Sequence, residues 1–131
     1  MSLPTLDHAQ TQSDKTNSCL FCHIISGKAP SKIIAENDSV MVIESIRPMY
    51  TSHWLIMPKK HIVNIKGAQP DDAATLAELM FSAQKLSKQL KAPGDFQFNI
   101  NNGAQAGQTV FHMHVHFLSN SSQIVPGKLV I

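Results

Sequence analysis

Apolar and polar residues alternate strictly in one stretch near the end of the chain, between Thr109 and Leu118. Large apolar side chains take every second place there, and the places between them are taken by His112, His114 and His116. Successive side chains of a β-strand point to opposite faces of a sheet. The pattern therefore predicts a strand that buries its apolar side chains and lines up three histidines at an open surface.

Four more strands are predicted by shorter apolar runs. Two runs on either side of the polar turn 37–39 form a β-hairpin, and a third run is closed by Pro58, which cannot donate to a sheet ladder. Alternation of polar and apolar residues after Gly94 predicts the strand that precedes the histidines. The four predicted strands cover residues 32–36, 40–44, 52–57 and 95–101.

One long helix is predicted between Pro70 and Pro93. Proline and two acidic residues stand in its first turn, where the helix dipole favours acidic groups, and the pair Pro93-Gly94 ends it. Its apolar residues recur every three to four positions. All of them are expected to face the sheet as core residues: Leu76, Leu79, Met80, Ala83, Leu86 and Leu90.

A short helix is predicted over residues 19–26. It follows the polar pair 17–18, which suits an N-cap, and it precedes Gly27, which suits a C-cap. The spacing of Cys19 and Cys22 puts both thiols on one face of this helix. In a reducing compartment such a pair is interpreted as free thiols or metal ligands and not as a disulfide.

These elements predict one α+β domain with a five-stranded antiparallel sheet, one long helix and one short helix, because strands and helices do not alternate regularly. A chain of 131 residues is long enough to bury a core without disulfides. Residues 1–17 are polar and show no periodicity, so they are expected to form a flexible N-terminal tail. The domain itself is assigned to residues 18–131.

Composition narrows the classes of partner. The formal net charge is +2, and the longest basic run is only Lys59-Lys60, so no nucleic-acid-binding patch is predicted. No stretch approaches 18 consecutive apolar residues, and no charged leader precedes an apolar run. We therefore expect a cytoplasmic protein that binds neither nucleic acid nor membrane.

Three imidazoles on one face can exchange protons, attack an electrophile, or bind an anion or a metal, because histidine titrates near neutrality. A strand that merely exposes three histidines to solvent is the plain alternative. A metal site made from all three is disfavoured by geometry. On a straight strand His112 and His116 lie roughly 13 Å apart, whereas metal–nitrogen bonds are about 2 Å long.

The segment from His112 to Leu118 resembles the signature of the histidine triad (HIT) family, in which three histidines alternate with apolar residues and two further apolar residues follow. Other stretches strengthen the resemblance: Ile33-Ile34, Ser52-His53, Pro58-Lys59-Lys60-His61 and Gly107-Gln108-Thr109. The similarity runs from about Cys19 to Leu118 and is strongest to the phosphoramidase-like, nucleotide-binding branch. It implies a HIT-like fold and a homodimer.

The resemblance also implies an activity: hydrolysis of nucleoside monophosphate derivatives, such as purine nucleoside phosphoramidates, through a nucleotidyl-histidine intermediate. In this reading His114 is the nucleophile, His116 contacts the phosphate, His53 donates a proton to the leaving group, and His112 completes the triad. Three alternatives stay open: a dinucleoside polyphosphate hydrolase, a nucleotide-binding regulatory module with little turnover, and a metal-binding protein.

The nucleotide-binding residues implied by the resemblance are Ser45, Ile46, Asn101, Gly107, Gln108 and Thr109. The alternative for Asn101 and Gln108 is ordinary polarity at a strand edge. Ser45 departs from the family pattern, because many relatives carry an aspartate there that binds the ribose hydroxyls. Neutral hydrogen bonds from a serine are about half as strong as those to a carboxylate, so weak ribose selectivity is expected.

The resemblance implies a structural zinc site as well. Some bacterial relatives bind zinc through two cysteines and two histidines, and the matching residues here are Cys19, Cys22, His61 and His112. Thiolate and imidazole ligands suit tetrahedral zinc. The alternative is a pair of inert, buried thiols. The zinc would support the fold, and the chemistry at His114 would not require it.

Overall fold

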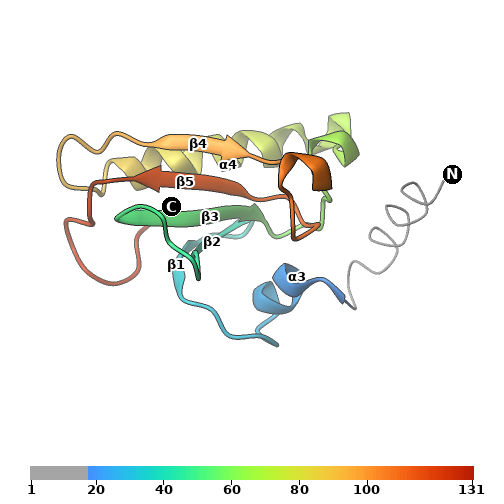
Figure 1. Ribbon diagram of the computed structural model, residues 1–131, viewed down its shortest axis with the longest axis horizontal. Coiled ribbons are helices and arrows are strands. Elements are labelled where there is room, and N and C mark those ends of the chain that lie inside the picture. The colour runs from blue at the N-terminus through green and yellow to red at the C-terminus, as the bar shows by residue number, and fades with distance from the viewer. Residues whose placement is uncertain (1–17) are drawn as a thin grey trace, which may run out of the picture.

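A five-stranded antiparallel sheet forms the centre of the computed structural model, which describes residues 18–131 (Figure 1). The strand order is β1-β2-β3-β5-β4, and every neighbouring pair is antiparallel. The strands are β1 (Ile33–Glu36), β2 (Val40–Glu44), β3 (Ser52–Pro58), β4 (Gln97–Ile100) and β5 (Val115–Ser119). The predicted sheet is confirmed. The predicted tail, residues 1–17, lies outside the described residues.

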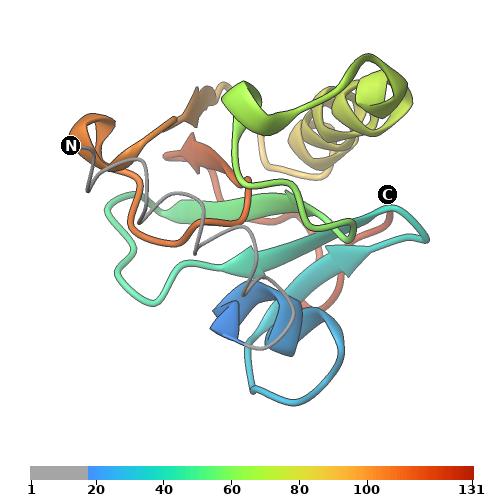
Figure 2. The same cartoon turned by 90° about the vertical axis from the view of Figure 1, so that its right-hand side faces the viewer.

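Two α-helices cover opposite faces of the sheet (Figure 2). The short helix α3 (Leu20–Ile25) precedes the first strand, and the long helix α4 (Ala73–Ser87) connects β3 to β4. Short 3-10 turns complete the structure: η1 (Ile65–Gly67), η2 (Pro70–Asp72) and η3 (Ala104–Ala106). The predicted combination of one long and one short helix is confirmed.

The larger core lies between α4 and the sheet. Trp54 and Phe117, opposite each other on β3 and β5, stack with ring centroids 5.2 Å apart and are almost fully buried. Leu79, Ala83 and Leu86 of α4 pack against the same cluster. Met113 and Val115 also enter it, so apolar residues of the histidine segment turn toward the core as predicted.

The other face of the sheet is only partly covered. Phe21 and Ile24 of α3 pack on Met41, Ile43 and Met57 of β2 and β3. The short helix contributes nothing to the core on the far strands β4 and β5. Their side chains on this face are therefore available to line a site.

The predicted strand over residues 109–118 is too long. Residues 110–112 form a bend, and regular pairing begins only at Val115, so His112 and His114 precede the strand. The Met113 N–H donates to the Ile62 carbonyl at 2.6 Å, which ties this segment to the chain that follows β3. His112 is fully buried and His114 is 7% exposed. The prediction of three histidines in a row at an open surface is wrong.

The long helix also departs from its prediction. The first turn, η2, is a 3-10 turn closed by a reciprocal capping box between Gln69 and Asp72, and α4 ends at Ser87. The assignment of Met80 to the core is wrong, because its side chain is 64% exposed. Leu79 already faces the sheet, and a helix rotates about 100° per residue, which turns Met80 toward the side.

The predicted N-cap of the short helix, the pair 17–18, is wrong. Its N-cap is Cys19, whose sulfur accepts a hydrogen bond from the Cys22 N–H at 3.2 Å. Gly27 follows the C-cap with a φ of 82°, a left-handed conformation that favours glycine. The cap draws the Cys19 thiol toward the first turn, beside Cys22.

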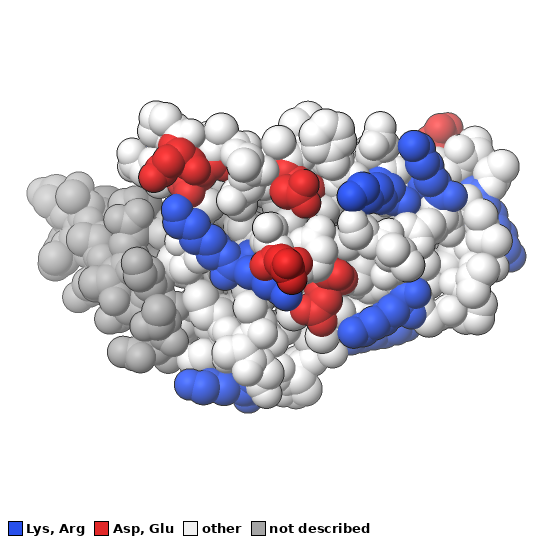
Figure 3. All heavy atoms as spheres, turned by 180° about the vertical axis from the view of Figure 1, so that it is seen from behind, with Lys and Arg blue, Asp and Glu red and all other residues white. Residues whose placement is uncertain are grey.

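Charges of both signs are interspersed on the face that α4 covers (Figure 3). Glu36 of β1 lies 2.9 Å from Lys59 and 3.7 Å from Lys128. Both lysines hold the pKa of the Glu36 carboxyl below its ordinary value. Within residues 18–131, none of the helices has the length and hydropathy that crossing a bilayer requires.

Candidate active site and metal centre

His114 lies at the centre of the site, beside Phe21 of α3 and directly before the first residue of β5. Its Nδ1 lies 2.8 Å from the His112 carbonyl oxygen. A carbonyl can only accept, so Nδ1 carries the hydrogen, and the neutral ring keeps its lone pair on Nε2. Burial lowers the pKa of His114, and the hydrogen bond to His112 opposes that shift. The arrangement presents a neutral imidazole with one chosen nucleophilic nitrogen.

Two aromatic neighbours fix the orientation of the His114 ring. The Phe21 ring meets it edge to face, with centroids 5.0 Å apart and an interplanar angle of 90°. The His116 ring lies 5.3 Å away at 62°. Phe21 belongs to α3 and His116 to β5, so the helix and the sheet hold His114 between them.

A chain of hydrogen bonds fixes the tautomer of His116. The Met49 N–H donates to His53 Nδ1 at 3.1 Å, so a neutral His53 carries its hydrogen on Nε2. That Nε2 lies 3.1 Å from His116 Nδ1 and donates to it. Neutral His116 therefore carries its own hydrogen on Nε2, as a donor.

Burial keeps both rings of this pair neutral. The pKa of His53 is lowered by burial. The pKa of His116 is lowered to about 4, mainly by burial and further by the neighbouring rings of His114 and His53. The chain from Met49 to His116 is therefore intact at neutral pH, since protonating either ring would remove an acceptor.

His53 is enclosed by its two hydrogen-bond partners. The side chain is only 5% exposed, and both ring nitrogens are engaged, one by Met49 and the other by His116. Direct proton donation from His53 to a leaving group would require breaking the bond to His116. In this geometry His53 fixes the tautomer of His116, and its expected role as the leaving-group acid stays a prediction.

Gln108 is the centre of the loop that precedes the histidines. Its amide nitrogen donates to the carbonyls of Val63 and Val110 at 2.8 and 3.0 Å. Its amide oxygen accepts from Asn64 Nδ2 and from the Gly103 N–H, both at 2.9 Å. Both amide hydrogens are thus used inside the protein. The side chain thus holds the loop in shape, and its expected contact with a nucleotide stays a prediction.

The other loop residues expected to contact nucleotide lie beside this brace. Asn101 Nδ2 donates to the Ala106 carbonyl at 2.7 Å and closes the loop. Gly107 has a φ of 94°, a left-handed conformation that favours glycine. Its N–H donates to the Ala104 carbonyl at 3.1 Å, so its expected contact with a nucleotide stays a prediction. Thr109 is exposed, which leaves its hydroxyl available to a phosphate.

Two residues near the site were not predicted from the sequence. Asn99 pairs with His116 across β4 and β5, so its side chain points to the same face as the histidine. The alternation of residues 97–100 would have shown this face, but only the register reveals the partner. Asn64 is fully buried and holds Gln108, a long-range contact for which the sequence gives no signal.

The segment expected to bind the ribose follows β2. Ser45 Oγ accepts a hydrogen bond from the Arg47 N–H at 3.2 Å, and Ile46 is 91% exposed. The Ser45 N–H donates to the His53 carbonyl, which ties this turn to the histidine chain. Glu44 pairs with Lys32 at 3.4 Å. The Ser45 hydroxyl thus begins a loop beside the site, and its contact with ribose stays a prediction.

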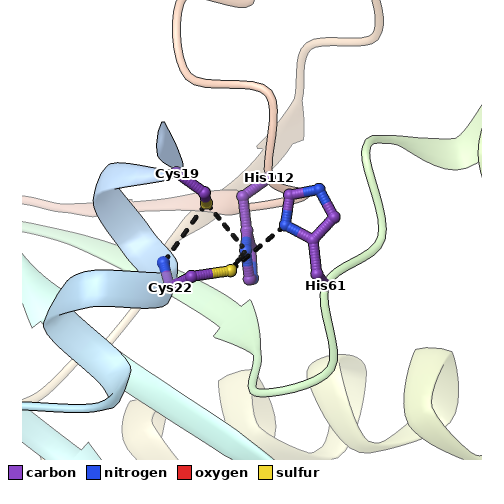
Figure 4. A group of neighbouring side chains, drawn as sticks. All are labelled: Cys19, Cys22, His61 and His112. Carbon is purple, nitrogen blue, oxygen red and sulfur yellow. Dashed lines mark hydrogen bonds between the residues drawn. The ribbon is translucent and has the colours of Figure 1, made fainter. Parts of the chain in front are cut away.

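The four residues predicted to bind zinc come together (Figure 4). Cys19 and Cys22 come from α3, His61 follows β3, and His112 precedes β5. One ligand atom from each residue lies within 4.8 Å of all the others. His112 Nδ1 is 3.5 and 3.6 Å from the two sulfurs, and His61 Nδ1 is 3.2 Å from the Cys22 sulfur.

These distances fit a tetrahedral ion. Zinc bonds of about 2.0–2.3 Å imply that neighbouring ligand atoms lie about 3.3–3.8 Å apart. His112 donates through Nε2 to the Pro58 carbonyl at 2.7 Å, which leaves the Nδ1 lone pair directed at the thiols. Burial lowers the pKa of His112 to about 4, so the ring is neutral, as a metal ligand must be. The donor set therefore fits zinc.

The sheet topology, the histidine segment and the neighbouring loop define a histidine triad fold and site. The chain belongs to the HIT domain family, whose family model matches residues 26–123. It is 36% identical over 99 residues to an uncharacterized HIT-like protein of Synechocystis. The aligned region covers 76% of this chain and 87% of that protein. Family membership, inferred first from the motif, is confirmed.

Solved structures of the family show the same fold. A HIT family hydrolase of Legionella pneumophila is 34% identical, with a TM-score of 0.74, covering 78% of this chain and 92% of that one. A zinc-bound histidine triad family protein of Mycobacterium smegmatis is 32% identical, with a TM-score of 0.67, covering 82% and 76%. HIT family hydrolases are thus among the structural neighbours of this chain.

Proposed function

We propose that this protein hydrolyses purine nucleoside phosphoramidates or related nucleoside monophosphate derivatives. The observation that carries the proposal is the state of His114: a buried neutral imidazole whose Nδ1–H is held by the His112 carbonyl. Its Nε2 lone pair is thereby prepared for attack on an α-phosphorus. Neutral imidazole is a good nucleophile at pH 7, and the phosphoramidate it forms is labile enough to be resolved by water.

In the first step a bond forms between His114 Nε2 and phosphorus, and the bond from phosphorus to the leaving amine breaks. The leaving nitrogen takes up a proton from solvent and departs as an amine. In the second step water attacks phosphorus and loses a proton to solvent, the bond to His114 breaks, and the nucleoside monophosphate is released. The two displacements replace one difficult direct hydrolysis.

His116 is the group best placed to bind the phosphate. Its Nε2–H is fixed as a donor by the bond from His53, so it can donate a hydrogen bond to a phosphate oxygen. Both rings stay neutral in this role, and no proton leaves His116 or His53. A donor fixed in this way stabilises the negative charge that gathers on the phosphate in the transition state.

The phosphate is expected to bind beside the loop that Gln108 holds. The N–H groups of residues 106–108 already donate to the carbonyls of Gly103 and Ala104, so we propose the hydroxyl of the exposed Thr109 as the donor to its oxygens. Such donors stabilise the negative charge that gathers in the transition state. Asn99, on the same face as His116, is a further candidate donor.

Zinc is the metal we propose for the cluster of Cys19, Cys22, His61 and His112. Its role is structural, because all four ligand positions are filled by side chains and none remains for substrate. The zinc-bound relative from Mycobacterium smegmatis supports this choice. Elemental analysis should find one zinc per chain, and chelation should lower the melting temperature. A melting temperature that does not change with chelator would contradict the zinc site and favour the alternative, in which the two cysteines are inert thiols.

A homodimer is proposed from the free edge of the sheet. β4 is one of the two edge strands, so one side of its backbone has no partner strand within residues 18–131. Met80 and Phe81 expose apolar surface on helix α4, at 64% and 53%. A second copy that continues the sheet would cover both. Light scattering that reports a monomer at micromolar concentration would contradict the dimer.

A substrate panel tests the proposed activity. Adenosine 5′-phosphoramidate, guanosine 5′-phosphoramidate and a dinucleoside polyphosphate are compared at equal concentration, with release of nucleoside monophosphate as the readout. The proposal expects a kcat/KM that is highest for the phosphoramidates. Faster cleavage of the dinucleoside polyphosphate would favour the second hydrolase reading. Tight nucleotide binding without turnover of any substrate would favour a regulatory module, which the serine at position 45 would suit.

A further inference from the structure

His112 is attached to both the metal centre and the nucleophile. Its ring is enclosed, with Nδ1 among the thiols of Cys19 and Cys22 and Nε2 bound to the Pro58 carbonyl. Its main-chain carbonyl oxygen, at the same residue, accepts the Nδ1–H of His114 at 2.8 Å. Whatever fixes the His112 ring therefore also fixes the acceptor that orients His114.

A second connection runs through the short helix. Phe21 lies between the two cysteines in sequence and is 4% exposed. Its ring meets His114 edge to face at 5.0 Å and His112 at 6.0 Å. The thiols of Cys19 and Cys22 join α3 to His112, so the same cluster that holds the helix also holds Phe21 against the nucleophile.

We infer that the Cys19–Cys22–His61–His112 centre positions the nucleophile, with the His112 carbonyl and the Phe21 ring as the two connections. His112 and Phe21 are positioning residues: both act on substrate only through His114. The inference rests on the proposed function, because it assigns the metal centre a part in the reaction at His114.

The physical reason is the length of the helix and the position of the acceptor. A helix of six residues has too few internal hydrogen bonds to hold its own shape, so α3 depends on its packing and on the thiol cluster. The acceptor for His114 stands in a bend with no sheet pairing. A displacement of about 1 Å in a reacting group can cost about 10²-fold in rate.

The test compares two variants that lose stability for different reasons. Cys22→Ser removes a metal ligand that belongs to the cluster. Leu86→Ala leaves a cavity under α4, on the opposite face of the sheet, and is the matched control. For each protein four quantities are measured below its melting temperature: zinc content, kcat for adenosine phosphoramidate, the Kd of adenosine monophosphate, and the NMR signals of the His114 ring.

Cys22→Ser is expected to lose its zinc, and its kcat should fall by about 10- to 100-fold. The Kd of adenosine monophosphate should stay within about twofold of wild type, because the substitution removes no hydrogen bond to the nucleotide. The His114 ring signals should broaden or split. Leu86→Ala should keep the zinc, the kcat and the ring signals. A zinc-free Cys22→Ser with unchanged kcat and ring signals would overturn the inference, as would an equal loss of kcat in Leu86→Ala.

Two further measurements cover the case in which Cys22→Ser does not fold. Wild type stripped by a chelator and reloaded with zinc should lose and regain kcat without a matching change in Kd. Phe21→Leu keeps an apolar side chain and all four ligands, so it should retain zinc while kcat falls more than Kd rises. Unchanged kcat in both experiments would overturn the inference. Absence of turnover in zinc-loaded wild type would contradict the proposed function instead, and the ring signals would still report on the positioning.

Discussion

The two faces of the sheet are built for different purposes. The face under α4 is covered along its length by a helix of 15 residues, and Trp54, Phe117 and Leu86 are almost fully buried there. The other face is covered by a helix of only 6 residues, which packs on β2 and β3. Polar side chains, His53 and His116 among them, occupy what that short helix leaves uncovered.

The difference shows where stability and chemistry come from. Apolar burial under α4 stabilises the fold by roughly 25 cal/mol for each Å² removed from water. Burial on the other face instead suppresses charge, as the pKa of about 4 for His116 shows. Neutral rings with fixed tautomers are costly to bury and are useful for catalysis. The short helix thus leaves a place where the sheet can hold polar groups without surrounding them completely.

The sharpest way to break this comparison is to truncate one residue on each face. His114→Ala should lower kcat by at least about 10⁴-fold, because nucleophilic catalysis is lost, while nucleotide binding survives. Leu86→Ala should lower the free energy of unfolding by about 2–5 kcal/mol, because it leaves a cavity in a fully buried site. Steady-state kinetics and denaturant unfolding of both variants check the two halves.

Two results would contradict this separation of catalysis and stability between the two faces. Substantial residual turnover in His114→Ala would mean that water attacks the phosphorus directly. A large loss of kcat in Leu86→Ala, measured well below its melting temperature, would mean that the packing under α4 contributes directly to the site.

A second prediction concerns the brace beneath the phosphate loop. Gln108→Leu should lower the free energy of unfolding by about 3 kcal/mol, because the buried partners Asn64 and Gly103 lose their acceptor. Gln84→Leu is the control: this glutamine is exposed on α4, so its replacement should change stability by less than about 0.5 kcal/mol. Equal effects in denaturant unfolding would show that Gln108 does not hold the loop.

Much of the fold follows from local pattern. Alternation and helical spacing predicted all five strands and both helices, since each element buries a face that its own sequence defines. The four zinc-binding candidates were brought together by the family motif and are neighbours in space. Residues with one local role, such as Gly27 at the end of α3, were also predicted correctly.

The errors arise where distant contacts override the local pattern. Residues 109–114 alternate like a strand, but the bond from Met113 to Ile62 and the enclosure of the His112 ring bend them out of the sheet. Met80 has helical spacing, yet the rotation of α4 turns it outward. The engagement of His53 by Met49 and His116 depends on a strand register that one sequence does not contain.

A third prediction concerns the sugar. Ser45→Asp keeps an acceptor for the Arg47 N–H and adds a second, charged oxygen. If this position faces the ribose, affinity for ribonucleotides should rise by about ten- to a hundredfold, since hydrogen bonds to a charged group are worth about 1.5–3 kcal/mol. The gain should shrink with 2′-deoxy analogues. Equal changes in Kd for the two sugars would show that position 45 does not contact the ribose and that another group, such as Glu44, binds it.

The smallest predicted effect is on the acid limb of the pH profile. His116 has a pKa of about 4 in the folded protein, against an ordinary value near 6.5, and that of His53 is also lowered. The His116 ring should therefore stay neutral from about pH 8 to about pH 5. Protonation of His116 should reduce kcat/KM only as the pH falls toward about 4. An acid limb centred near 6.5 would mean that these rings titrate as if exposed.

The same shifts fix the sign for stability. Below about pH 6.5 His53 and His116 are protonated in the unfolded chain, whereas their lowered pKa values keep them neutral in the folded protein. The stability that the neutral rings allow is present above that pH and is lost as the pH falls toward about 4. Melting temperatures measured across this range should fall together with the pH. A melting temperature constant from pH 7 to pH 4 would contradict the lowered pKa values.

The most direct test of the central claim is intact-mass spectrometry after rapid mixing with adenosine 5′-phosphoramidate. The wild-type protein should gain the mass of one adenylyl group, fragmentation should place that group on His114, and His114→Ala should show none. Turnover by the wild type without any adduct under rapid quench, or an adduct on a different histidine, would contradict attack by the Nε2 of His114.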